Sequence, residues 1–74
     1  MRTRAQIEEL IHRIYRDLGN DPADLVLIKP MDGSWEDALS YVVTRRDEKK
    51  TQVYRRDLDD RNENGIKASL NAFA

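Results

Sequence analysis

The apolar positions near the start of the chain predict an amphipathic helix. Large apolar side chains recur at spacings of three and four residues, at Ile7, Leu10, Ile11, Ile14, Tyr15 and Leu18. This spacing places them on one stripe of a helix, with charged side chains on the other face. Thr3 and Gln6 have capping-box spacing, and Gly19 stands where a left-handed residue would end the helix. We therefore predict a helix over residues 4–18 that packs on another element.

A run of apolar residues predicts a strand over residues 25–29. The run follows a breaker cluster at residues 20–22 and precedes Pro30. An unbroken apolar run between turn signals is typical of a strand that is covered on both faces. Proline has no backbone N–H, so the strand should end at Pro30 and lead into a turn over residues 31–34.

Residues 35–46 fit two interpretations. Trp35 and the apolar residues after it fit a helical stripe that Ser34 and Asp37 could cap, whereas residues 40–44 are mostly β-branched and aromatic, which favours a strand. Residues 51–54 form another strand candidate, and the charged residues 47–50 suit a loop between two strands. We favour a β-hairpin, with a helical turn near residues 35–39.

The hairpin can be assigned a register. If Arg46 pairs with Thr51, one face of the hairpin holds Tyr41, Val43 and Tyr54. The other face then holds Val42, Thr44 and Val53. This register predicts that the two tyrosines lie on the same side of the sheet.

The last segment predicts a second helix. Ile66, Leu70 and Phe73 recur at helical spacing among alanines, and Asp60 or Asn62 could serve as the N-cap. The alternation of residues 66, 68 and 70 also fits a strand, but the alanine content favours the helix. We predict one small α+β domain over residues 1–74: a helix, a three-stranded antiparallel sheet and a helix, with both helices on one face.

Composition narrows the function classes. The chain has 74 residues, of which 39% are hydrophobic and 36% charged, with a formal net charge of −1. A chain of this size buries only about 60% of its unfolded surface, which leaves room for one small core. It contains no cysteine, so neither a disulfide framework nor a thiolate zinc site is expected. Without an apolar run of membrane-spanning length or a signal peptide, we expect a cytoplasmic protein with no membrane partner.

No complete catalytic or cofactor motif is present. His12 is the single histidine, with no recognisable nucleophile or second base in a pattern around it. Residues 60–65 match the first half of a calcium loop, but its twelfth position is Asn71, where a bidentate glutamate would be needed. Helix capping explains the same Asp and Asn residues. We expect no metal, no cofactor and no catalytic residue.

A cluster of basic residues is the main candidate for a contact surface. It comprises Arg45, Arg46, Lys49, Lys50, Arg55 and Arg56. In a hairpin these side chains would form a positive finger able to meet phosphates, with Tyr41 or Tyr54 available for stacking. Acidic neighbours such as Asp47 neutralise part of the cluster, and positive charges on edge strands also discourage aggregation.

Trp35 has two roles open to it. The favoured one is to close the rim of the core, and the alternative is to anchor a partner.

These observations favour a non-enzymatic protein-interaction module, such as an adaptor or a small inhibitor of a larger complex. Small accessory proteins of bacteria and phages fit this description. The alternative is a nucleic-acid-binding protein that uses the basic hairpin at residues 45–56. An uncovered sheet face also makes a homodimer a reasonable expectation. The predicted partner-binding residues are Trp35, Tyr41, Arg45, Arg46, Lys49, Lys50, Tyr54, Arg55 and Arg56.

Overall fold

The computed structural model describes residues 3–74 and contains one antiparallel sheet with strand order β1-β2-β3. The elements in chain order are α1 (Arg4–Asp17), a short 3-10 helix η1 (Pro22–Asp24), β1 (Leu25–Pro30), β2 (Ser40–Arg45), β3 (Lys50–Tyr54), α2 (Arg55–Asp59) and α3 (Glu63–Leu70). The predicted α+β fold, with helix, three-stranded sheet and terminal helical segment, is confirmed. The short helix α2 was not predicted.

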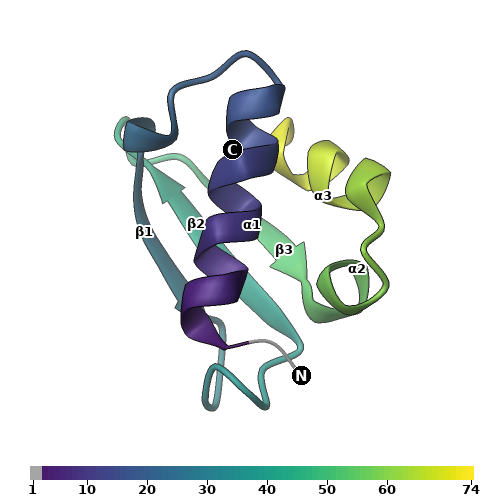
Figure 1. Cartoon of the computed structure of the whole chain (residues 1–74). Coiled ribbons are helices and arrows are strands. Elements are labelled where there is room, and N and C mark those ends of the chain that lie inside the picture. Colours follow the sequence, from purple (N-terminus) through teal and green to yellow (C-terminus); the bar gives the residue numbers. More distant parts are fainter. Residues whose placement is uncertain (1–2) are drawn as a thin grey trace.

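Helix α1 begins and ends as its sequence predicts. The Gln6 N–H donates to Thr3 Oγ1 at 3.3 Å and the Thr3 N–H donates to Gln6 Oε1 at 2.9 Å, which completes the capping box. The chain leaves the helix at Gly19 with a φ of +90°. The apolar stripe is buried at Ile7, Ile11, Ile14 and Tyr15. It lies across one face of the sheet (Figure 1).

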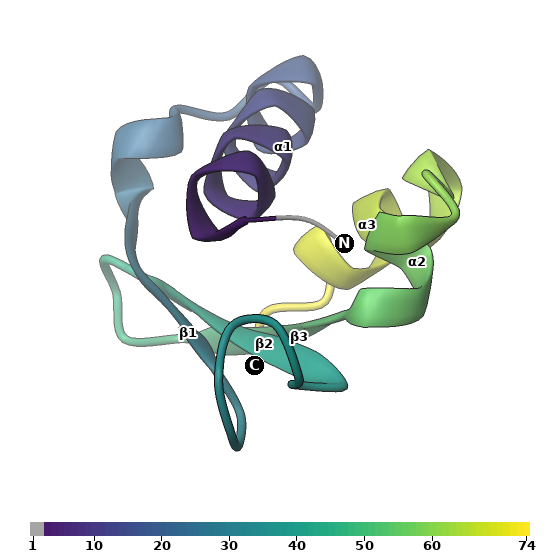
Figure 2. The same cartoon turned by 60° about the horizontal axis from the view of Figure 1, so that its bottom comes forward.

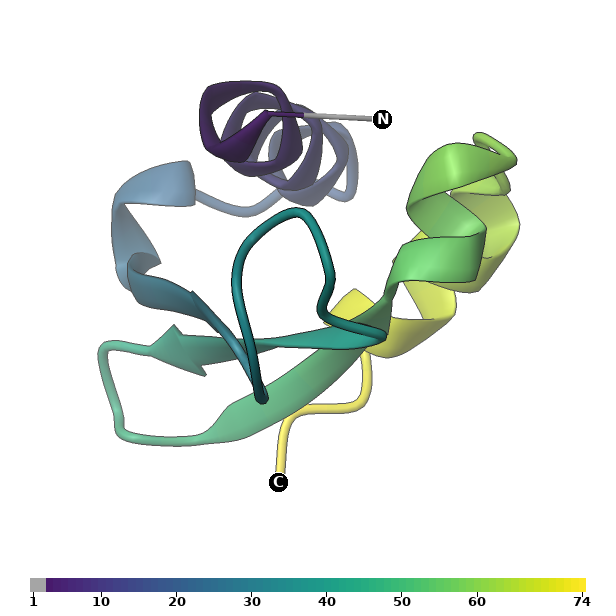
Figure 3. The same ribbon diagram turned by 90° about the horizontal axis from the view of Figure 1, so that it is seen from below.

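The core lies between α1 and the sheet and extends toward α2 and α3. Figures 2 and 3 show α1 above the sheet, with α2 and α3 beyond β3 on the same side. The fully buried side chains include Ile7, Ile11, Ile14, Tyr41, Val43, Val53, Leu58, Ile66 and Leu70. No helix of the described chain covers the opposite face of the sheet, which we call the outer face (Figure 3).

The register of the hairpin differs from the predicted one by three residues. Tyr41 pairs with Val53, and Val43 pairs with Thr51. Because three is an odd number, the two faces of β3 are interchanged relative to the prediction. Val53 therefore joins Tyr41 in the core, and Tyr54 lies on the outer face.

The shift arises because the hairpin loop covers residues 46–48, so that it is one residue shorter than the predicted loop over residues 47–50 and also begins one residue earlier. The Arg45 N–H donates to the Lys49 carbonyl at 2.8 Å, and the Glu48 N–H donates to the Arg45 carbonyl at 2.9 Å. Glu48 has a φ of +70°. A turn followed by a left-handed residue is a common three-residue hairpin loop.

The prediction that β1 is covered on both faces is wrong. The side chains of Val26 and Leu27 are 56% and 47% exposed. The register of β1 against β2 shifts between Leu25 and Leu27, which marks a β-bulge. The extra residue lets Leu25 and Ile28 both face the core although they are three positions apart. The apolar run therefore contributes side chains to both faces of the sheet, although the helices cover only one of these faces.

Local capping elsewhere follows the prediction. Ser34 Oγ accepts from the Asp37 N–H at 3.2 Å in the turn before β2. Asn62 is the N-cap of α3, and its Oδ1 accepts from the Gly65 N–H at 3.2 Å. Helix α3 ends at Leu70, before the predicted position of Phe73, whose ring instead packs edge-on against Tyr15 with centroids 6.1 Å apart.

Candidate functional site

The structure divides the basic cluster into two groups. Arg45, Arg46, Lys49 and Lys50 lie at the hairpin loop, whereas Arg55 and Arg56 belong to α2, beyond the other end of β3. At about 3.3 Å per residue, the strand separates the two groups by about 16 Å. The predicted hairpin over residues 45–56 is therefore wrong at its second end, because burial of Leu58 in the core turns the chain into a helix there. No continuous positive stripe forms.

The arginines of the hairpin loop are already paired. Arg45 binds Asp47 through two contacts, Nε to Oδ1 at 2.9 Å and Nη2 to Oδ2 at 2.6 Å. The hydrogen bond from Arg45 lowers the pKa of Asp47 to about 2, and the same bond raises the pKa of Arg45. Arg46 lies 3.6 Å from a carboxylate oxygen of Asp24 and donates to the Ala23 carbonyl at 3.2 Å. A phosphate would therefore compete with existing partners.

The second basic group is also partly neutralised. Arg55 Nε lies 3.8 Å from Asp59 Oδ2, and Arg55 Nη1 donates to the Glu36 carbonyl at 3.0 Å. Of the predicted basic residues, Lys49, Lys50 and Arg56 are exposed and make no ion pair in the described part of the chain. Lys49 and Lys50 lie at the hairpin loop and Arg56 lies in α2, so the three side chains do not form one finger.

Trp35 and Tyr41 form a structural pair. Their rings stack with centroids 5.3 Å apart, and the guanidinium of Arg4 lies 5.2 Å above the Trp35 ring. Trp35 is half-buried, at the rim of the core. Tyr41 is fully buried, and this burial raises the pKa of its hydroxyl. The predicted use of Tyr41 for stacking on a partner is therefore wrong.

Tyr54 is the predicted contact residue that does lie on an open apolar surface. Its side chain is 49% exposed, on the outer face of the sheet. Leu27 and Met31, which are 47% and 49% exposed, contribute further apolar area from β1 and the turn after it, and Val42 is half-buried between them on β2. We call Leu27, Met31, Val42 and Tyr54 the apolar patch. The sequence predictions missed its other three members because they expected β1 to be covered on both faces and placed Tyr54 on the opposite face from Val42.

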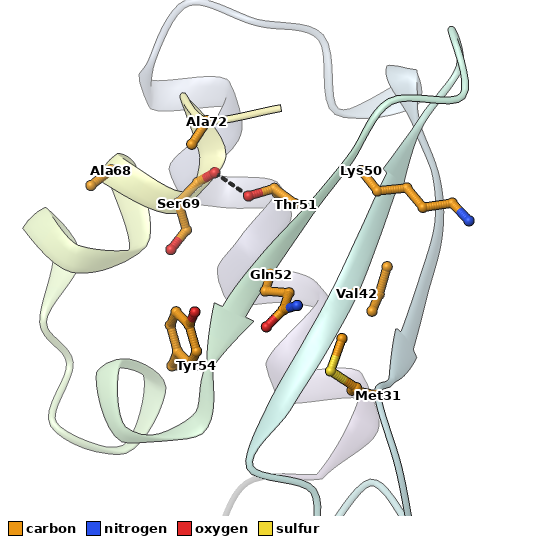
Figure 4. A pocket seen from close by; sticks show the side chains of 9 residues that line it. All are labelled: Met31, Val42, Lys50, Thr51, Gln52, Tyr54, Ala68, Ser69 and Ala72. Carbon is orange, nitrogen blue, oxygen red and sulfur yellow. Dashed lines mark hydrogen bonds between the residues drawn. The ribbon is translucent and has the colours of Figure 1, made fainter. Parts of the chain in front are cut away.

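A groove between the sheet and α3 contains three of the four residues of the apolar patch. Its volume is about 590 Å³, and it is lined by Met31, Val42, Lys50, Thr51, Gln52, Tyr54, Ala68, Ser69 and Ala72. Figure 4 shows the strands on one side and the end of α3 on the other. The Thr51 hydroxyl donates to the Ser69 carbonyl at 2.6 Å and fastens the two sides together. The small side chains of Ala68 and Ala72 leave the groove wide.

Metal-binding geometry is not found in the described residues. Within residues 3–74 no three His, Cys, Asp or Glu side chains gather in an arrangement that could hold a metal ion. In the segment that matches half a calcium loop, Asn62 caps α3 and its Nδ2 donates to Asp57 Oδ1 at 3.2 Å. His12 is half-buried on α1, away from the groove.

Two further findings bear on function. None of the helices in residues 3–74 combines the length and the apolar character needed to cross a bilayer. No protein family, curated protein or solved structure matches this chain. The function is therefore inferred from the surface of the molecule itself.

Proposed function

We propose that this chain is a non-enzymatic protein-interaction module of the cytoplasm, an adaptor or small inhibitor that binds its partner through the outer face of the sheet. The observation that carries this proposal is the apolar patch at Leu27, Met31, Val42 and Tyr54, which the fold leaves open to water. Exposed patches that gather several large apolar side chains are candidate sites for binding a protein partner.

Energetics favour this face over the hairpin loop. Apolar surface that leaves water contributes about 25 cal/mol per Å². An aromatic side chain such as Tyr54, surrounded by aliphatic groups, is typical of a binding hot spot. The hairpin arginines offer less, because exposed ion pairs contribute about 1 kcal/mol or less and Arg45 and Arg46 would have to exchange one partner for another.

The chemistry of the groove supports binding rather than catalysis. Among the residues that line it, only Lys50 and Tyr54 carry titratable side chains. A general acid–base mechanism needs a titratable pair with complementary roles near the working pH. The remaining lining groups are apolar side chains, hydroxyls and one amide, which suit recognition.

A variant of the outer face tests the proposal. The double variant Leu27→Ser/Tyr54→Ser removes apolar area from exposed positions, so the fold should be retained. The wild-type chain is immobilised, a partner is captured from source cells and identified, and its affinity is then measured with purified proteins. We expect the double variant to bind this partner at least tenfold more weakly, a loss of about 1.4 kcal/mol or more.

The matched control changes the hairpin loop instead. The variant Arg46→Ser/Lys49→Ser alters two exposed side chains that do not line the groove. We expect it to bind like the wild type. The proposal is overturned if the partner binds the outer-face variant normally, or if only the loop variant loses binding. Salt-sensitive retention of DNA or RNA that depends on the loop would point to the nucleic-acid alternative.

A further inference from the structure

We infer, on the basis of the proposed function, that the partner presents an amphipathic helix with acidic flanks, which lies across the outer face along the groove beside α3. Four observations lead to this occupant: the state of each sheet edge, the shape of the groove and the distribution of charge.

The free edge of β1 is poorly suited to accept an added strand. The Met31 N–H donates to the Ser40 carbonyl at 3.0 Å. In an antiparallel ladder, hydrogen-bonded and non-hydrogen-bonded pairs alternate. The next pair, Pro30 with Tyr41, is therefore not hydrogen-bonded, and the backbone groups of Pro30 point away from β2. Proline has no N–H to offer at this outward position, and the bulge next to Leu27 further disrupts the edge.

The edge at β3 is occupied where the strand begins. Lys50 and Ala74 exchange two backbone hydrogen bonds, at 3.0 and 3.1 Å. Beside them the Thr51 hydroxyl donates to the carbonyl of Ser69, which lies in α3. The start of this edge is therefore closed to a partner strand, and only the outward backbone of Gln52 and Tyr54 is left along it, which is too little for a strand of ordinary length. The outer face remains as the route to the apolar patch.

The shape of this face suits a helix as the partner. The groove is open to solvent, with the strands as its floor and Ala68 and Ala72 on its wall (Figure 4). A helix has a diameter of about 10 Å and packs well on a twisted sheet, as α1 does on the other face. A flat lipid surface would meet the rims and leave the floor of the groove uncovered.

The charge of this face selects the partner. The three strands contain no Asp or Glu. Lys29 pairs with Val42 and Lys50 pairs with Thr44, which places both lysines on the outer face beside the apolar patch. A second copy of the chain would bring two lysines from each molecule, four in all, with no carboxylate from either sheet. Acidic side chains beside the apolar stripe of a helix complement this arrangement.

Selection from a peptide library tests the inference. The library displays amphipathic helical peptides whose apolar stripes are flanked either by glutamates or by lysines, and the full chain is immobilised. We expect the glutamate-flanked peptides to be enriched. In NMR titrations they should shift the amide signals of Val42, Gln52 and Tyr54.

Charge reversal provides the specific readout. We expect the variant Lys29→Glu/Lys50→Glu to bind an enriched peptide at least tenfold more weakly than the wild type does. A peptide with lysine in place of glutamate should bind this variant with the affinity restored. Lys49→Glu, in the hairpin loop, is the matched control and should leave the affinity unchanged. Enrichment of lysine-flanked peptides, no enrichment, tighter binding to anionic vesicles, or a dimer formed through this face each overturns the inference.

The same variants separate this inference from the proposed function. A native partner that needs Leu27 and Tyr54 but tolerates Lys29→Glu/Lys50→Glu leaves the proposed function standing and rejects the acidic helix. A partner that needs neither pair of residues rejects both.

Discussion

The hydroxyl of Tyr41 donates a hydrogen bond to the carbonyl oxygen of Trp35, and the rings of the two residues stack with centroids 5.3 Å apart. The pair connects the middle strand of the sheet to the loop that precedes it. Since Tyr41 is fully buried, its hydroxyl has no access to water as a substitute partner. The contact therefore fixes the loop against the core.

We predict that Tyr41→Phe lowers the free energy of unfolding by about 1 kcal/mol, because the ring contact is kept while the hydrogen bond to Trp35 is lost. Urea denaturation followed by tryptophan fluorescence measures this change. Tyr54→Phe is the control, since the Tyr54 hydroxyl makes no hydrogen bond in the described part of the chain and its loss should change stability by no more than about 0.5 kcal/mol. Equal stability of Tyr41→Phe and the wild type would contradict the assigned role.

The pair Arg45–Asp47 makes stability depend on pH. Unfolded peptides have an Asp pKa of about 3.9, and the Arg45 hydrogen bond lowers the pKa of Asp47 to about 2 in the fold. A lowered carboxylate pKa favours the folded state above about pH 4, and this contribution disappears as the pH falls toward about 2. We predict that Asp47→Asn is less stable than the wild type at pH 7. The difference in the free energy of unfolding should shrink as the pH falls from about 4 to about 2.

Urea denaturation at a series of pH values tests this difference, and an NMR titration of the Asp47 carboxyl gives its pKa directly. Asp32→Asn is the control, because Asp32 makes no ion pair within residues 3–74. A stability difference for Asp47→Asn that stays constant down to pH 2 would show that the Arg45 contact is not formed in solution.

We predict that Pro30→Val makes the protein associate as its concentration rises. Valine restores a backbone N–H on the outward side of β1, where an edge strand can then pair with another molecule. Light scattering coupled to gel filtration measures the mass. Pro22→Val, in η1 outside the sheet, is the matched control and should keep the mass of the wild type. The same mass for both variants at every concentration would refute the protective role of Pro30.

We predict that Asn62→Ala destabilises the fold by about 1 kcal/mol, as expected for the loss of an N-cap. Asn62 accepts from the Gly65 N–H and donates to Asp57, so the change releases two contacts at the start of α3. Thermal unfolding measures the effect. Asn64→Ala, at an exposed position within the same helix, should be neutral or slightly stabilising because alanine is the better helix former. A neutral Asn62→Ala would mean that α3 does not depend on this cap.

The parts of the fold that the sequence predicts are those with repeated signals. The stripe of α1 recurs over several turns and has a marker at each end, at Thr3 and Gly19, so its bounds were predicted to within one residue. Helix α2 spans five residues and buries one leucine, Leu58, which is too short for any periodicity to show. Its existence depends on packing against the rest of the core.

The faces of the strands were harder to predict for a physical reason. One extra or missing residue is enough to exchange the two faces of a strand. Here the faces depend on two unusual residues. Glu48 has a positive φ without being glycine, and Val26 is the extra residue of the bulge in β1. The candidate site was affected in turn. Tyr54 was placed on the same side as Tyr41, so its neighbours Met31 and Val42 on the outer face were not recognised.

The hydrogen bond between the Thr51 hydroxyl and the Ser69 carbonyl has a kinetic consequence. Together with the exchange between Lys50 and Ala74, it holds the α3 wall against β3 before any partner arrives. A preorganised surface loses little conformational entropy on association, and encounter need not wait for a slow rearrangement. Complex formation should therefore follow second-order kinetics up to high partner concentration. Differences in affinity should then come from the dissociation rate constant rather than from the association rate constant.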